Sequence, residues 1–315
     1  MRRALLVGID GYPAAPLAGC VADAEAMAEV LRTNVDGSPN FDCQLLTTPP
    51  ATITRAVLKR KINELFQQTT DLALFYFSGH GTENDLGGYL VTPDAATYDE
   101  GVAMADVLTL AHKSRIAEIV IILDCCSSGA FGALPTVDNE AATLREGVSV
   151  LTASRSNEAA IELGGRGMFT ELVCDALAGG ASDVLGNVTA ASVYTYVDES
   201  LGAWDQRPLF KAHVSRLLPL RRDRPAVELS TLRQLGTWFS SGDAVFGLDP
   251  SYEPTERPHD ADREGIFRQL QKCRDAKLIE PVGEEHMYYA ALHSTGCRLT
   301  PLGRHYWRLA REGRI

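Results

Sequence analysis

Three short apolar runs, each followed by a glycine-containing loop, constrain the fold of this chain most. They are Ala4–Ile9, Leu72–Phe77 and Ile119–Leu123. Each has the length of a buried strand, and amphipathic helical patterns lie between them. Those patterns cover Cys20–Arg32, Thr52–Gln67 and Met104–Ser114. Alternation of strand and helix predicts an α/β domain with a mainly parallel central sheet.

The same pattern continues after a segment rich in Gly, Pro, Asp, Asn and mixed charges, residues 130–147, which we expect to form a long exposed loop. We expect strands at Val148–Thr152 and Phe210–Leu217, and helices at Met168–Leu177 and Ala191–Leu201. The first domain is therefore predicted to span residues 1–220.

A charged cluster, Arg221–Pro225, interrupts the alternation and is interpreted as a linker to a second domain, residues 226–315. Helical spacing and a possible hairpin follow. The predicted helices are Leu229–Phe239, Arg263–Ala276 and Pro301–Arg311, and the hairpin pairs Leu278–Val282 with Met287–Leu292. Helices followed by a small hairpin favour a winged-helix-like α+β fold.

Apolar length and cysteine usage indicate a cytoplasmic protein. No apolar run approaches the roughly 20 residues of a membrane helix, and the first residues lack the pattern of a secretory signal. The seven cysteines are scattered, which fits a reducing compartment. None forms a C-x-x-C pair with nearby histidines, so we expect no structural zinc site.

The formal net charge of -11 is concentrated in the first domain. Residues 226–315 carry 12 Lys and Arg and 13 Asp and Glu, which leaves 18 and 28 for residues 1–225. An acidic first domain would repel nucleic acid and attract cationic peptide segments.

Two predicted strands end in residues that can carry chemistry. Ser78-Gly79-His80-Gly81 follows one, and Asp124-Cys125-Cys126-Ser127-Ser128-Gly129 follows the other. Because parallel strands end at one sheet edge, a His and a Cys are expected there together. A thiolate attacks acyl groups while an imidazole manages the proton, and the N–H groups of Gly81 and Cys126 are candidate oxyanion donors. A lone cysteine after a buried strand is more often a packing residue, but two such strand ends favour acyl transfer.

These segments, in their order and spacing, resemble the caspase-like peptidases over about residues 1–220, most closely the metacaspases and bacterial orthocaspases. The matching stretches are Ala4–Ile9, Leu17–Ala24, Phe75–Gly81, Gly88–Asp94, Asp124–Gly129, Val150–Ser154 and Glu158–Glu162.

The resemblance implies a caspase-like three-layer fold and a cysteine endopeptidase whose dyad is His80 and Cys126, with Gly81 in the oxyanion hole. The family's nucleophile stands two residues after the Asp of its motif, which selects Cys126 over Cys125. Cys125 is then a packing residue or has a redox or supporting role. Ser127 departs from the His that metacaspases commonly carry there.

The resemblance also implies an acidic pocket for the residue before the cleaved bond, formed by Cys20, Asp23, Ser78 and Asp124. Two carboxylates would pair a guanidinium, so cleavage after Arg or Lys is expected. A caspase that cuts after Asp would instead need basic residues there. Taken alone, Asp23 is equally well explained as a solvated charge near a helix N-terminus.

Two regulatory features of the family are left open by the sequence. The loop between the subunits contains Arg145, so self-cleavage after it and an intact single chain are both possible. Many metacaspases bind calcium near the cysteine motif, but Ala130–Ala133 has no carboxylate there. We therefore expect no cofactor, with Asp94, Asp99 and Glu100 as the remaining calcium candidates.

The second domain carries a basic run, which other charges offset. The run consists of Arg298, Arg304, Arg308, Arg311 and Arg314. We expect a solvated helix face and a module that recruits a protein partner or sensor, rather than a nucleic-acid site. Family habit suggests bacterial stress, cell-death or defence signalling. Two alternatives are a pseudoprotease that binds peptides without cutting them and a DNA-binding regulator whose first domain senses a ligand.

Overall fold

The computed structural model describes residues 2–48, 52–97, 99–125, 144–153, 162–163, 166–201, 208–214 and 216–315. The chain forms two compact units. Unit 1 comprises Met1–Ser182 and Asn187–Asp223, and unit 2 comprises Asp183–Gly186 and Arg224–Ile315. Within the described ranges, every helix is too short or too polar to cross a membrane.

Unit 1 is built on a six-stranded sheet in the order β12-β8-β7-β3-β1-β2. All neighbouring strands are parallel except β12, which runs antiparallel to β8. The strands are β1 (Arg2–Ile9), β2 (Phe41–Thr48), β3 (Leu72–Ser78), β7 (Glu118–Asp124), β8 (Val148–Thr152) and β12 (Leu209–His213). The predicted α/β fold with a mainly parallel sheet is confirmed.

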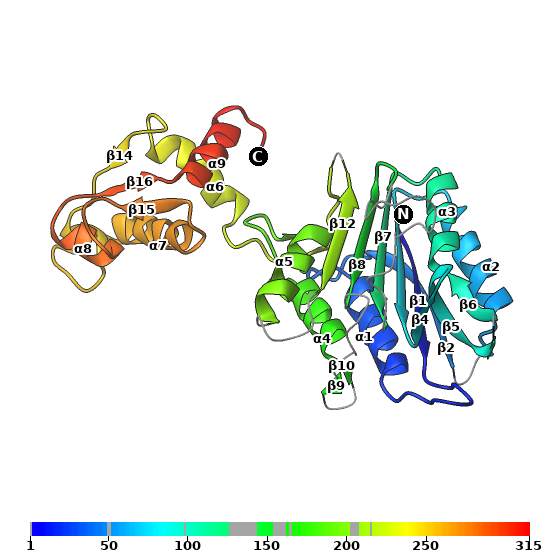
Figure 1. The fold of residues 1–315 in the computed structure, drawn as a ribbon. Coiled ribbons are helices and arrows are strands. Elements are labelled where there is room, and N and C mark those ends of the chain that lie inside the picture. Colours follow the sequence, from blue (N-terminus) through cyan, green and yellow to red (C-terminus); the bar gives the residue numbers. More distant parts are fainter. Residues whose placement is uncertain are drawn as a thin grey trace. The chain divides into compact units, whose positions relative to one another are not determined.

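Helices cover both faces of this sheet, as Figure 1 shows. Apolar residues of α1, α4 and α5 fill one face, and those of α2 and α3 fill the other. Their bounds are α1 (Cys20–Arg32), α2 (Arg55–Phe66), α3 (Met104–Lys113), α4 (Met168–Asp175) and α5 (Ala190–Ser200). Because both faces are covered, every residue of β3 and β7 is buried. This explains why these strands are continuous apolar runs rather than alternating patterns.

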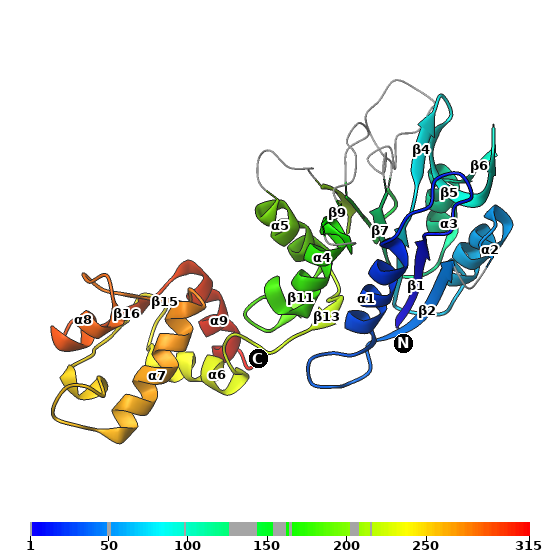
Figure 2. The same cartoon turned by 90° about the horizontal axis from the view of Figure 1, so that it is seen from below.

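Smaller elements complete unit 1. A three-stranded sheet of β4 (Gly81–Asn84), β5 (Gly87–Ala96) and β6 (Asp99–Ala103) packs on the side of α2 and α3, as Figure 2 shows. The π-helix η2 (Ala176–Gly180) follows α4, and two short antiparallel pairs join β9 (Glu162–Leu163) to β10 (Arg166–Gly167) and β11 (Asn187–Val188) to β13 (Arg221–Arg222).

Two predicted bounds in unit 1 differ from the structure. The boundary between the units, after Asp223, falls within the predicted linker Arg221–Pro225, but Arg221 and Arg222 form β13, and the Arg221 guanidinium donates to the carbonyls of Thr33 and Leu177. The strand predicted for Phe210–Leu217 is present as β12 and ends at His213.

Unit 2 has its own apolar core and a three-stranded antiparallel sheet in the order β14-β16-β15. Its elements are α6 (Leu229–Trp238), β14 (Val245–Phe246), the 3₁₀ helix η3 (Pro250–Tyr252), α7 (Ala261–Asp275), β15 (Ile279–Pro281), α8 (Met287–Leu292), β16 (Cys297–Leu299) and α9 (Pro301–Arg311).

The predicted hairpin of unit 2 is wrong in its second strand. Residues 287–292 form helix α8, which buries Met287, Ala290 and Ala291. These positions have the i, i+3, i+4 spacing of a helix face. The partner of β15 is β16, so Ile279 pairs with Leu299. The winged-helix-like fold as a whole stays a prediction.

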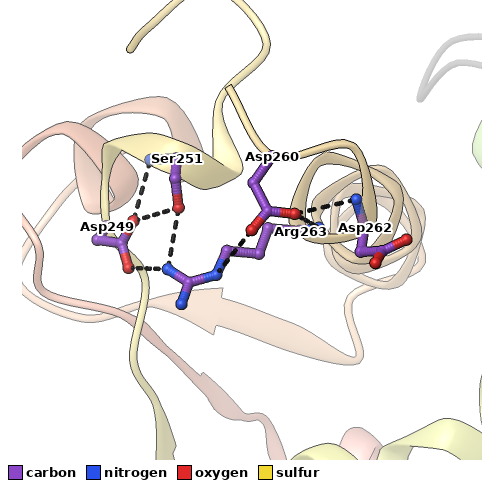
Figure 3. Close-up of polar contacts among 5 residues, drawn as sticks. All are labelled: Asp249, Ser251, Asp260, Asp262 and Arg263. Carbon is purple, nitrogen blue, oxygen red and sulfur yellow. Dashed lines mark hydrogen bonds and ion pairs between the residues drawn. The ribbon is translucent and has the colours of Figure 1, made fainter. Parts of the chain in front are cut away.

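Polar contacts fasten the start of α7 to η3 in unit 2 (Figure 3). Arg263 Nη1 donates to Asp249 Oδ2 at 2.6 Å and to Ser251 Oγ at 2.9 Å, while Asp260 accepts from the amides of Asp262 and Arg263. The Ser251 hydroxyl, which also donates to Asp249, holds the pKa of Asp249 below its usual value. The ionised Asp249 carboxylate therefore stabilises this part of the fold at neutral pH, and its contribution is lost as the pH falls through the acid range.

One glycine allows α1 to reach the carboxyl end of β1. A Cβ on Gly8 would lie 2.2 Å from the carbonyl oxygen of Cys20, the first residue of α1. Gly8 also pairs with Ser78, the last residue of β3. Its missing side chain thus brings the start of α1 close to the ends of β1 and β3.

We predict that Gly8→Ala lowers the free energy of unfolding by about 3 kcal/mol, because the new methyl group meets backbone atoms that cannot rotate away. Gly265→Ala is the matched control, since nothing lies within 4 Å of a Cβ at that helical position. It should leave stability unchanged or raise it by about 1 kcal/mol. Urea unfolding of the full chain measures both, and equal midpoints would contradict the close approach.

Candidate active site

His80 stands in the turn between β3 and β4. The turn is held by the Gly79 amide, which donates to the Asp124 carbonyl at 3.3 Å, and by the Val91 amide, which donates to the His80 carbonyl at 3.0 Å. The His80 side chain is half-buried. Its imidazole is therefore carried on a backbone fixed to both β7 and β5.

The imidazole is oriented by a backbone carbonyl. His80 Nε2 lies 2.7 Å from the Ala15 carbonyl oxygen, in the loop between β1 and α1. A carbonyl oxygen only accepts hydrogen bonds, so Nε2 carries the proton in this contact. In the neutral imidazole, Nδ1 is then the acceptor. This tautomer suits a base that takes a proton through Nδ1.

Asp23 and Asp124 converge on Gly167. A Cβ on Gly167 would lie 2.6 Å from Asp124 Oδ2 and 3.3 Å from Asp23 Oδ2. The two carboxyl groups come from α1 and β7, and they are only 2% and 7% exposed. Only glycine at position 167 therefore lets the backbone pack this closely against the two buried carboxyl groups.

Donors from separate elements hold these carboxylates. Asp23 Oδ2 accepts from Ser78 Oγ at 3.3 Å and from the Gly167 amide at 3.4 Å, and Asp124 Oδ2 accepts from Thr170 Oγ1 at 2.6 Å. Since Thr170 gives its one proton to Asp124, the Tyr76 hydroxyl 2.6 Å away donates to Thr170. Such donors favour the ionised carboxylate.

Cys20 completes the predicted pocket residues beside this group. Burial raises the pKa of the Cys20 thiol; a hydrogen bond with Ser78 opposes the shift, and Asp10 and Asp124 add to it. A thiol with a raised pKa is a poor nucleophile. The structure thus brings Cys20, Asp23, Ser78 and Asp124 together, with Cys20 as a neutral member.

A cavity of about 850 Å³ opens between α1 and α4, which lie next to each other in Figure 2. Asp23 and Thr170 line it, together with the acidic side chains Glu29, Glu171 and Asp175 and with Arg221. The lining thus carries more carboxylates than cations, and Asp23 is one of them.

The predicted nucleophile, Cys126, lies outside the described residues, as do residues 130–143 of the predicted loop. Its neighbour Cys125 is 1% exposed and belongs to the apolar core between the sheet and α2 and α3. That position agrees with a packing role. Gly81, the candidate oxyanion donor, begins β4 directly after His80 and is half-buried.

Arg145 is bound to the body of unit 1. Its guanidinium donates to the carbonyls of Ala111, Ile116 and Glu146 at 2.7 to 2.9 Å. Gly147 adopts φ +87°, and its amide donates to the His213 carbonyl at 2.7 Å. Cleavage after Arg145 would require these contacts to break first.

The three calcium candidates are engaged with protein donors. Asp94 accepts from Thr92 and from the Arg55 amide, Asp99 pairs with the Arg55 guanidinium, and Glu100 accepts from Asn84. Among the residues that the structure describes, no group of three or more His, Cys, Asp or Glu side chains is arranged to hold a metal ion.

A family model described as the caspase domain matches residues 1–219. The chain belongs to this caspase-domain family. Membership indicates a cysteine-type peptidase, whose substrates are proteins or peptides. The predicted caspase-like fold of the first domain is therefore confirmed.

Two solved structures are similar to this chain. The Geobacter sulfurreducens protein GSU0716 is similar with a TM-score of 0.52 at 18% identity, over 71% of this chain and 97% of that one. Caspase-1 from Spodoptera frugiperda gives a TM-score of 0.46 at 15% identity, over 70% and 90%. No curated protein matches the sequence.

Three residues of the candidate site were not found from the sequence. Asp10 accepts from the amides of Cys20 and Val21 and so caps α1 from outside the helix. It directly follows β1 at the same sheet edge as His80, so the strand-end rule that selected His80 applies to it too. Gly167 and Thr170 come from later in the chain, at and after the end of β10, where no apolar run marks them.

Proposed function

We propose that this chain is a cysteine endopeptidase of the metacaspase or orthocaspase type, which hydrolyses peptide bonds after Arg or Lys with a His80–Cys126 dyad. The observation that carries the proposal is the oriented imidazole of His80, two residues after Ser78, which pairs with Asp124 across the sheet and donates to Asp23. The motif Asp124-Cys125-Cys126 supplies the nucleophile two residues after one of those carboxylates.

In the proposed mechanism, the Cys126 thiolate attacks the carbonyl carbon, and His80 holds the proton of the thiol on Nδ1. Amide N–H groups of Gly81 and Cys126 stabilise the oxyanion. The imidazolium then protonates the amine as the peptide bond breaks, and the acyl group remains on Cys126 as a thioester. Water attacks the thioester with His80 as general base, and the thiol is regenerated.

Two carboxylates in a desolvated site support the preference for Arg or Lys. Charge-assisted hydrogen bonds to a guanidinium are strong and directional, whereas an Asp side chain at this position would face like charges. We expect catalysis without a cofactor. Self-cleavage after Arg145 stays a hypothesis, which requires the Arg145 contacts to be released.

The dyad is tested with fluorogenic peptides ending in Arg, Lys or Asp. We expect the wild type to cleave the Arg and Lys peptides, and Cys126→Ala and His80→Ala to lose at least about 10³-fold in kcat. Activity should persist with a chelator present. Equal activity of Cys126→Ala would contradict the nucleophile, and peptide binding without cleavage by a folded wild type would favour the pseudoprotease alternative.

The pocket is tested by Asp23→Asn. Removing one charge from the site should lower kcat/KM for the Arg peptide by about 10- to 100-fold, because a charged hydrogen bond contributes about 1.5–3 kcal/mol. Glu25→Gln is the matched control, since Glu25 is an exposed carboxylate on the same helix. A wild type that prefers the Asp peptide, or equal losses in both variants, would contradict the pocket assignment.

We further propose that residues 226–315 recruit a protein partner or sensor rather than DNA, in a cytoplasmic bacterial stress, cell-death or defence response. The ion pairs of the basic run support this proposal, because neighbouring carboxylates neutralise much of its positive charge. Arg298 pairs with Glu280, Arg304 with Asp243 and Arg314 with Glu312, while Arg311 lies over the Trp307 ring.

Fluorescence anisotropy with a labelled DNA duplex tests this proposal. At low salt we expect no binding beyond that of an acidic control protein, because the 12 Lys and Arg of residues 226–315 are offset by 13 Asp and Glu that repel phosphates. Binding that weakens steeply with salt and is lost in the Arg304→Ala, Arg308→Ala double variant would favour the DNA-binding alternative.

A further inference from the structure

The loop between β1 and α1 contributes a tyrosine to the His80 turn. Tyr12 Oη accepts from the His80 amide at 2.9 Å and donates to the Val91 carbonyl at 3.2 Å. Its ring lies against the imidazole, with 4.6 Å between the ring centroids and an interplanar angle of 56°. Tyr12 is only 6% exposed, so the phenol is part of the interior and not a surface contact.

The phenol completes an incomplete pair of backbone hydrogen bonds. Val91 donates its amide to the His80 carbonyl. In a hydrogen-bonded antiparallel pair, the return bond would run from the His80 amide to the Val91 carbonyl. Here the Tyr12 hydroxyl stands between these two groups and bonds to both. The phenol therefore sets how far the His80 backbone stands from β5.

The same loop provides the carbonyl that orients the imidazole. Ala15 follows Tyr12 by three residues, and its oxygen accepts from His80 Nε2. Tyr12 thus fastens the loop that carries the acceptor to the turn that carries the histidine. Gly79 makes room for this contact, because a Cβ there would lie 2.5 Å from Tyr12 Oη.

We propose that Tyr12 is a positioning residue for His80, which holds the imidazole in the Nε2–H tautomer against Ala15 and keeps Nδ1 available to the nucleophile. The expected effect of Tyr12 on catalysis rests on the proposed function, whereas its expected effect on the His80 tautomer does not. Burial raises the pKa of Tyr12, so the hydroxyl stays protonated and continues to donate to Val91 throughout the neutral range.

Tyr12→Phe is the direct test, since it keeps the ring and removes both hydrogen bonds. We expect kcat for the Arg peptide to fall by about 10- to 100-fold with KM changed less than about threefold, as for a misplaced catalytic group. The ¹⁵N shifts of the His80 ring in the full chain should change from one dominant tautomer to a mixture. Tyr194→Phe is the control, because Tyr194 stacks on Phe210 in another part of unit 1.

Gly79→Ala provides a second variant, because its methyl group would lie 2.5 Å from Tyr12 Oη and 2.9 Å from the Phe77 ring, so that the phenol must move and the protein's folding is checked alongside. Gly79→Ala should reproduce the losses of Tyr12→Phe, and the double variant should lose no more activity than either single variant.

Unchanged kcat and an unchanged tautomer in a folded Tyr12→Phe protein would overturn the proposal, as would a rise in KM alone. If the wild type cleaves no peptide, the proposed function fails, and the tautomer measurement still decides the role of Tyr12.

Discussion

The pairing of β3 with β7 is the contact on which the candidate site depends. Its register places Ser78 opposite Asp124, so the two strands end together and bring His80 and Asp124 to one edge. A shift of one residue would turn every side chain of a strand to the other face. Because both faces of these strands are covered, such a shift would keep the apolar residues buried, but it would turn the Asp124 side chain away from Thr170 of α4, which donates to it.

The buried carboxyl groups of Asp23 and Asp124 tie distant parts of the chain together. Carboxyl groups removed from water are costly unless they have hydrogen-bond partners. Ser78, Gly167 and Thr170 supply donors from β3, β10 and α4, so elements distant in sequence must assemble before the charges are stabilised. Gly167 lets the backbone approach both carboxyl groups, since a Cβ there would lie 2.6 Å from Asp124 Oδ2 and 3.3 Å from Asp23 Oδ2.

The sequence predicted the helices and strands whose apolar residues recur with a regular buried period. The bounds of α1 and α9 agree with the predicted ranges, and the β3 and β7 ends located His80 and Asp124. It missed β2, which is half-exposed at the sheet edge and carries mixed polarity, and it took the six residues of α8 for a strand because so short an apolar run fits either period. Tyr12 and Ala15 were missed because they act through backbone groups of distant residues, which no local pattern records.

The composition of unit 2 bears on where this chain can be divided. Asp183–Gly186 belongs to unit 2, although the residues on either side of it belong to unit 1. Val184 and Leu185 in this segment pack against the core that Leu232 and Phe267 help to form. A shortened chain ending at Pro225 would keep these two apolar side chains without the core that covers them. The truncation itself would therefore expose an apolar patch on the first unit. Aggregation or altered binding of such a protein would follow from that patch and not from the loss of a partner of the second unit.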